Sequence, residues 1–127
     1  MRDAEPATRS PRTLAEAYRQ LATGDARLVA GRTDLHVALT SGTAAPPMSV
    51  IDLWQLDALR GIALDGADLV VGARSTWSEL RRSPLVRDRL PALAEVAALV
   101  GAAQIQNRGT IGGNIVTART RRRASAA

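Results

Sequence analysis

A run of eleven residues constrains this chain more than any other stretch. It reads Gln104-Ile105-Gln106-Asn107-Arg108-Gly109-Thr110-Ile111-Gly112-Gly113-Asn114. Two adjacent glycines can adopt positive φ and let another group approach the backbone closely. Thr110 and Asn114 place a hydroxyl and an amide beside peptide N–H groups, which suits a phosphate or pyrophosphate. The residues alone also allow an ordinary glycine-rich turn between two strands.

A second candidate loop lies far upstream. The segment Leu28-Val29-Ala30-Gly31-Arg32-Thr33-Asp34-Leu35 predicts a short apolar strand, a glycine turn and the start of a helix. The partial positive charge of a helix start favours a nearby anion by about 0.3–1 kcal/mol. Thr33 and Asp34 are equally consistent with plain N-capping, which needs no ligand. If the two loops face each other, they could hold one anionic ligand between them.

The composition excludes several other kinds of site. A chain of 127 residues with 46% hydrophobic residues predicts one globular domain. Because the chain has no cysteine, it cannot form disulfides, thiolate metal sites or iron–sulfur ligation of its own. The single histidine, His36, has no partner at ligand spacing, so we interpret it as a surface or packing residue.

The net charge of +5 is concentrated near one end of the sequence. All 17 basic residues are arginines, and residues 1–118 carry 13 of them against 12 acidic residues. The body is therefore nearly neutral, which argues against a nucleic-acid partner. No apolar run is long enough to span a membrane and no secretory signal is evident, so we expect a cytoplasmic protein.

Apolar spacing and turn residues predict a mixed order of helices and strands. We expect a mobile leader over residues 1–12 and a disordered basic tail over 119–127. The predicted helices cover 13–23, a segment from Thr33, a segment from Thr76, 85–90, and a segment from Pro91 to Gly101. The predicted strands cover 27–30, 48–53, 62–64, 69–72 and 115–117, with a hairpin between 62 and 72 and a loop over 40–47. This order indicates an α+β or α/β domain without internal repeats.

Taken in order, these segments resemble the FAD-binding (medium) subunits of molybdenum hydroxylases, the xanthine dehydrogenase and carbon monoxide dehydrogenase flavoprotein family. Residues 28–35 resemble the first flavin loop of that family, and residues 104–114 closely match its second. Between them, Ile51-Asp52-Leu53, Leu59-Arg60-Gly61-Ile62 and the segment 72–80 follow in the family's order. The resemblance covers about residues 13–118, which we expect to form a partial FAD-binding domain.

The resemblance implies an α+β fold of the vanillyl-alcohol-oxidase or PCMH type, in which two small subdomains hold FAD between them. It also implies binding of the pyrophosphate and ribityl chain, mainly through backbone N–H groups. The implied cofactor-binding residues are Leu28, Val29, Ala30, Gly31, Arg32, Thr33, Asp34 and Leu35 in the first loop and Thr110, Ile111, Gly112, Gly113 and Asn114 in the second.

The same resemblance implies an oxidoreductase component. The flavin would accept electrons from an iron–sulfur subunit and a molybdopterin-binding large subunit and pass them to NAD or another acceptor. No side chain of this chain is implied as an acid, a base or a nucleophile, and no metal site is implied. Trp54 and Trp77 are interpreted as packing residues rather than as partners that stack on the flavin.

The chain departs from the family pattern in two places. The family commonly has glycine where this chain has Arg32, so positive φ there would strain the arginine by about 1–2 kcal/mol. Its guanidinium could pair with a phosphate or point into solvent. After the second loop the family continues with a Ser-Pro pair, an aspartate and a further sheet, whereas this chain reads Arg119-Thr120-Arg121-Arg122-Arg123. We therefore expect the first part of a flavin subunit, with weak FAD binding.

Two alternatives stay open at this point. The chain could be a non-catalytic remnant or interaction module whose basic tail contacts acidic surfaces or nucleic acid. It could also keep the flavin fold and serve another reaction, because a fold does not determine a substrate.

Overall fold

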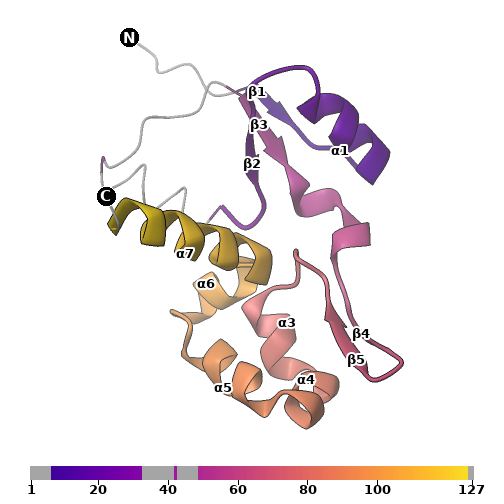
Figure 1. Cartoon of the computed structure of the whole chain (residues 1–127), viewed down its shortest axis with the longest axis vertical. Helices are drawn as coiled ribbons and strands as arrows, with labels where there is room; N and C mark the ends of the chain where they lie inside the picture. The colour runs from indigo at the N-terminus through magenta and orange to yellow at the C-terminus, as the bar shows by residue number, and fades with distance from the viewer. Residues whose placement is uncertain (1–6, 33–41, 43–48, 126–127) are drawn as a thin grey trace.

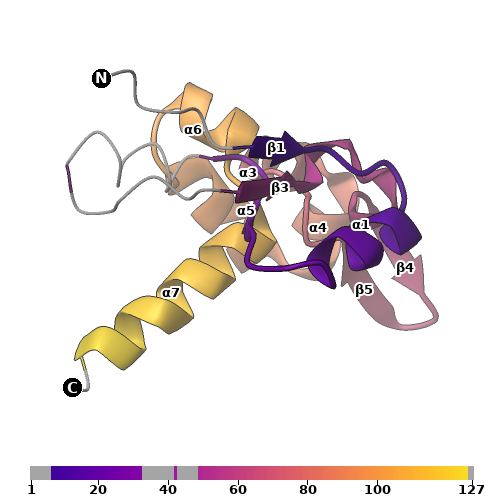
Figure 2. The ribbon, with the colours of Figure 1, turned by 90° about the horizontal axis from the view of Figure 1, so that it is seen from above.

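The computed structural model describes residues 7–32, 42 and 49–125, with side chains as far as 118. Its elements form two lobes (Figure 1). The sheet lobe contains three strands and helix α1 (Leu14–Leu21), and the helical lobe contains the hairpin β4–β5 and helices α3 to α6. Helix α7 (Ile111–Ser125) starts against the helical lobe and points away from it (Figure 2). The prediction of a mixed helix-and-sheet fold is confirmed.

The sheet lobe is built on three parallel strands in the order β1-β3-β2. These strands are β1 (Ala7–Arg9), β2 (Arg27–Val29) and β3 (Ser49–Asp52). The central strand β3 carries Val50 and Ile51, which are both buried, as expected for a strand with two neighbours. The predicted strands at 27–30 and 48–53 are thus confirmed within a residue or two of their ends.

Strand β1 corrects the expectation that residues 1–12 are all mobile. It pairs with β3 in the register Ala7↔Ser49, Thr8↔Val50 and Arg9↔Ile51. The Arg9 guanidinium also donates to Thr23 Oγ1 at 3.1 Å and to Ser49 Oγ at 3.2 Å. Backbone pairing and these long-range bonds order a segment whose own sequence has no apolar alternation, so pattern reasoning missed it.

Helix α1 begins and ends close to its predicted limits. Thr13 is the N-cap, and its hydroxyl accepts a hydrogen bond from the Glu16 N–H at 3.2 Å. The Glu16 carboxylate accepts a hydrogen bond from the Arg12 N–H at 3.0 Å, rather than from the Thr13 N–H as in an ordinary capping box. Ala17 is the buried residue of this helix, so α1 covers the sheet with a narrow apolar contact.

Two 3₁₀ turns, η1 (Leu53–Gln55) and η2 (Asp57–Leu59), connect the lobes. Leu56 lies between them and is fully buried, which fixes this connection in the interior. The chain then forms the predicted hairpin, β4 (Ile62–Asp65) and β5 (Asp68–Val71), with the register Asp65↔Asp68 next to its turn. Gly66 adopts φ 59° in that turn, a conformation that glycine takes without strain.

The helical lobe holds the larger apolar core. It contains α3 (Trp77–Arg82), α4 (Pro84–Arg89), α5 (Pro91–Leu99) and α6 (Ala103–Arg108). Its buried residues are Trp77, Leu80, Val86 and Ala97. Thr76 caps α3 in the predicted position with a complete capping box to Glu79. The predicted helices from Thr76, over 85–90 and from Pro91 are confirmed, whereas α6 covers a segment for which the sequence predicted no helix.

Helix α7 overturns two local expectations. The sequence predicted a glycine loop followed by a strand over 115–117, but residues from Ile111 onward form one continuous helix. The helix also continues to Ser125, through most of the segment expected to be disordered. Thr110 starts it, since its hydroxyl accepts from the Gly113 N–H at 3.1 Å and its carbonyl accepts from the Asn114 N–H at 3.0 Å.

Candidate functional site

The two candidate loops meet at Gly31. A Cβ placed on Gly31 would lie 1.7 Å from the Arg108 carbonyl oxygen and 3.2 Å from the Gly109 nitrogen. Only a residue without a side chain can therefore occupy this position in the present backbone. In Figure 1 the chain leaving β2 runs to the junction of α6 and α7. The structure thus brings the first loop and the second segment together, as the sequence argument required.

The structure describes only part of the first predicted loop. Leu28 and Val29 belong to β2, and the chain then turns through Ala30, Gly31 and Arg32. The other predicted site residues of this loop, Thr33, Asp34 and Leu35, lie outside the described residues. So does His36, which we interpreted as a surface or packing residue. The predicted helix from Thr33 and the loop over 40–47 also fall there, apart from Gly42.

Arg32 adopts the left-handed backbone conformation expected at a position where the resembling family commonly has glycine. Its φ is 63°, and it is the sole non-glycine residue with positive φ in the described segments. Its side chain forms an ion pair with Asp52, in which Nη2 lies 2.8 Å from Oδ2. The second Asp52 oxygen accepts from the Trp54 N–H at 2.9 Å. The Asp52 carboxylate at the end of β3 therefore binds Arg32 of the first loop and also caps the turn that begins the connection between the lobes.

Replacing Arg32 measures the strain at this turn. We expect Arg32→Gly to unfold at a higher temperature than Arg32→Ala, because alanine keeps a Cβ at positive φ. The free energy of unfolding of the two variants should differ by up to about 1–2 kcal/mol. Both variants lose the same half-exposed ion pair, so that loss, about 0–1 kcal/mol, cancels in the comparison. Thermal unfolding of the two proteins provides the measurement, and equal stability would contradict the strain.

Backbone hydrogen bonds join the second segment to residues 73–75, which precede α3. The Ile111 N–H donates to the Ser75 carbonyl at 3.0 Å, and the Gly112 N–H donates to the Ala73 carbonyl at 2.9 Å. A Cβ on Gly112 would lie 2.8 Å from that same Ala73 oxygen. The glycine therefore lets helix α7 begin in direct contact with the backbone of residues 73–75.

The backbone N–H groups where the second segment begins helix α7 already have acceptors within the chain. The N–H groups of Gly113 and Asn114 both donate to Thr110, and those of Ile111 and Gly112 donate to residues 73–75. All four amides thus have acceptors within the chain, so a phosphate could take them only by sharing them. The side chain of Asn114, which is exposed at the start of α7, remains the more accessible polar group of this segment.

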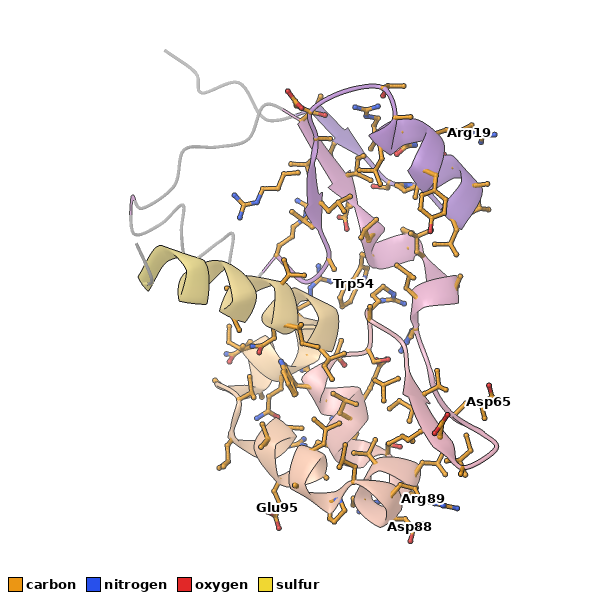
Figure 3. The ribbon with its side chains drawn as sticks, viewed as in Figure 1. Arg19, Trp54, Asp65, Asp88, Arg89 and Glu95 are labelled. Carbon is orange, nitrogen blue, oxygen red and sulfur yellow. The ribbon has the colours of Figure 1, made fainter. Side chains whose placement is uncertain are left out.

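Trp54 lies between the two lobes (Figure 3), and its indole contacts two arginine side chains. The guanidinium carbon of Arg108 is 3.9 Å from the ring centroid, and that of Arg74 is 4.9 Å away. Both distances are within the range of cation–π attraction. Trp54 therefore packs as the sequence predicted, but against charged groups, and nothing in the local sequence indicated those partners because they come from residues far along the chain.

Within the part of the chain that the structure describes, His, Cys, Asp and Glu side chains nowhere gather into a possible metal-binding group. Among those same residues, every helix is too short or too polar to cross a membrane.

The structure is thus a mixed helix-and-sheet domain in which two segments far apart in the sequence meet at Gly31. Residues 5–126 match the model of one family, described as the FAD binding domain in molybdopterin dehydrogenase. The chain belongs to this family of FAD-binding domains, whose cofactor is the one that the sequence predicted.

Characterised relatives agree with this assignment. The chain is 40% identical over 108 residues to the carbon monoxide dehydrogenase medium chain of Hydrogenophaga pseudoflava, covering 84% of this chain and 37% of that protein. It is 35% identical over 111 residues to the nicotinate dehydrogenase FAD-subunit of Eubacterium barkeri, covering 85% of this chain and 37% of that one. The chain thus spans little more than a third of the length of these relatives.

Solved structures agree with the fold. Carbon monoxide dehydrogenase from Hydrogenophaga pseudoflava superposes with a TM-score of 0.82 and 38% identity, covering 91% of this chain and 40% of that one. Quinoline 2-oxidoreductase from Pseudomonas putida 86 superposes with a TM-score of 0.80 and 32% identity, covering 89% and 40%.

Proposed function

We propose that this chain supplies the diphosphate-binding part of an FAD-dependent oxidoreductase subunit with a fold of the vanillyl-alcohol-oxidase or PCMH type. The observation that supports the proposal is the contact of Gly31 with the Arg108–Gly109 backbone, because it brings together the two segments that the sequence resemblance implies as cofactor loops. The proposal takes residues 28–35 and 110–114 as the binding residues and residues 13–118 as the domain.

The residues around this contact suit a diphosphate by charge and by access. Arg32 and Arg108 place a guanidinium on each of the two meeting segments, and Asp52 neutralises the first of them. A diphosphate bound here could compete with Asp52 for Arg32, since guanidinium pairs well with either oxyanion. The start of α7 adds the partial positive charge of a helix N-terminus.

When bound, FAD would supply the redox chemistry, and the protein would supply binding and orientation. In the full assembly we propose that electrons come from an iron–sulfur subunit and a molybdopterin-binding large subunit and leave to an acceptor such as NAD. The proposal draws on the relatives, which include dehydrogenase medium chains and FAD subunits. The chain's own contribution is then to hold the diphosphate end of the cofactor.

A titration with three ligands tests this proposal. We expect FAD and ADP to bind the chain and to compete, with Kd values between about 10 µM and 1 mM, whereas riboflavin, which lacks phosphate, should not bind measurably. Flavin fluorescence and its anisotropy measure FAD and riboflavin directly, and displacement measures ADP. Equal binding of riboflavin and FAD would contradict a diphosphate site, and failure of both FAD and ADP to bind would remove the proposal.

A charge change at the start of α7 provides the matched variant. Asn114→Asp should weaken FAD binding about tenfold or more by repulsion, yet an acidic residue in the first turn favours the helix. Gln104→Glu adds the same charge at an exposed position on α6 and should change the Kd much less. Equal losses in both variants would point to a general charge effect rather than to the proposed site.

A further inference from the structure

A hollow lies between the connection of the two lobes and the helical lobe, and of the two candidate segments only Asn107 contributes to its wall. It has a volume of about 550 Å³ and is lined by side chains from the connection between the lobes, from α3 and from α6. Trp54, at the centre of Figure 3, forms part of its wall. None of the residues 28–32 or 110–114 lines it. The hollow is therefore a second feature of the structure that the proposed diphosphate site does not explain.

Arg74 is the residue that makes this hollow unusual. Its side chain is only 5% exposed, and its Nε has no hydrogen-bond partner among the described residues. Within the described segments its one ionic contact runs from Nη2 to Asp57 Oδ1 at 3.4 Å, and the Asp57 side chain is 91% exposed. A buried guanidinium needs close oxyanion partners to offset the loss of water around it. A long contact to a solvated carboxylate and the face of Trp54 at 4.9 Å leave this guanidinium without a close oxyanion partner among the described residues.

The other charges around the hollow leave it positive. Arg60, Arg74 and Arg82 line it together with the two acidic residues Asp57 and Glu79. Arg60 and Glu79 form an ion pair with each other, so their charges largely cancel. Asn107 also lines the hollow, and because its Oδ1 accepts from Ser78 Oγ, its amide nitrogen is the remaining donor of that side chain. An anion entering here would meet two guanidinium groups and an amide.

We propose that this hollow is a binding site for a small oxyanion, a phosphate or carboxylate group, with Arg74 as its principal ligand. The guanidinium fork of Arg74 binds two oxygens of the anion, and Arg82 and Asn107 complete the site. Asp57 is a weak internal competitor that the anion replaces at Nη2. The site needs no flavin, and its occupation stabilises the arrangement of Trp54 against Arg74.

Inorganic phosphate is the probe, with acetate as the carboxylate arm and chloride at equal ionic strength as the reference. We expect phosphate and acetate to raise the unfolding temperature and to change tryptophan fluorescence in a saturable way. Arg74→Leu should weaken this binding at least tenfold, while Asp57→Asn should tighten it about threefold to tenfold because the competing charge is gone. Arg89→Leu, which removes an exposed arginine outside the hollow, should leave the Kd unchanged.

Several results would overturn the site. One is that Arg74→Leu binds phosphate with unchanged affinity. Another is that Arg74→Leu and Arg89→Leu lose equal phosphate affinity. A third is that Asp57→Asn gains no phosphate affinity. If Arg74→Leu does not fold, Asp57→Asn decides alone, since its exposed side chain can be changed without disturbing the core. Folded Arg74→Leu should still bind FAD as the wild type does. This outcome separates the oxyanion site from the proposed diphosphate site, because either can fail without the other.

Discussion

Replacing Gly31 by alanine should lower the free energy of unfolding by about 3 kcal/mol or more. The added methyl group would lie 1.7 Å from the Arg108 carbonyl oxygen and 2.5 Å from its carbon, and both are backbone atoms that cannot rotate aside. Overpacking in a fixed interior usually costs about 1–3 kcal/mol, and a clash this close belongs at or beyond the upper end. Urea unfolding measures the change, and FAD affinity should fall with it because the two loops separate.

The hairpin glycine Gly66 provides the control for this prediction. A Cβ there meets nothing within 4 Å, so Gly66→Ala costs only the left-handed backbone, about 1–2 kcal/mol. Its effect on FAD binding should be absent, since the hairpin turn lies at the far end of the helical lobe (Figure 1). If Gly31→Ala were as stable as Gly66→Ala, the contact between the loops would not exist in solution.

Alanine substitutions at the adjacent glycines Gly112 and Gly113, at the start of α7, should change stability by different amounts. Gly112→Ala should destabilise the protein by about 1–3 kcal/mol, because its methyl group would meet the Ala73 oxygen at 2.8 Å and the Ala73 Cβ at 2.9 Å. Gly113→Ala should stay within about 1 kcal/mol of the wild type, since alanine gains about 0.8–1 kcal/mol of helix propensity. That gain offsets a contact with the short Thr110 side chain at 2.9 Å.

Circular dichroism during thermal unfolding distinguishes the two variants. The helical structure predicts a large difference between them, whereas a glycine loop with positive φ at both positions would make both substitutions harmful. Similar losses at Gly112 and Gly113 would therefore favour the loop that the sequence suggested over the helix that the structure shows.

The elements that the sequence predicted well are those whose signals are local. Thr13 and Thr76 cap their helices through hydrogen bonds to residues three positions later, and such bonds can be inferred from the residue types alone. The hairpin at 62–71 has its turn residues next to one another in the chain. The meeting of residues 28–35 with the second segment was expected from the family resemblance and not from a local signal, and Gly31 does lie against Arg108 and Gly109.

The features that the sequence did not predict depend on partners far along the chain. Gly112 and Gly113 suggested a loop because glycine is a poor helix former, yet bonds to Ala73 and Thr110 hold these residues in a helical turn. The ion pair of Arg32 with Asp52 joins residues that no spacing rule connects. Trp54 acquires its cationic neighbours in the same way, because Arg74 and Arg108 reach it only after the lobes come together.

The Gly31 contact has a consequence for motion. The lobes are joined by the covalent connection through Leu56 and a second time where Gly31 rests on Arg108 and Gly109. Separating the lobes would therefore require breaking the Gly31 contact, which joins residues far apart in the chain. A ligand near either attachment should therefore slow amide hydrogen exchange in both halves at once, including β2 and the first turn of α7.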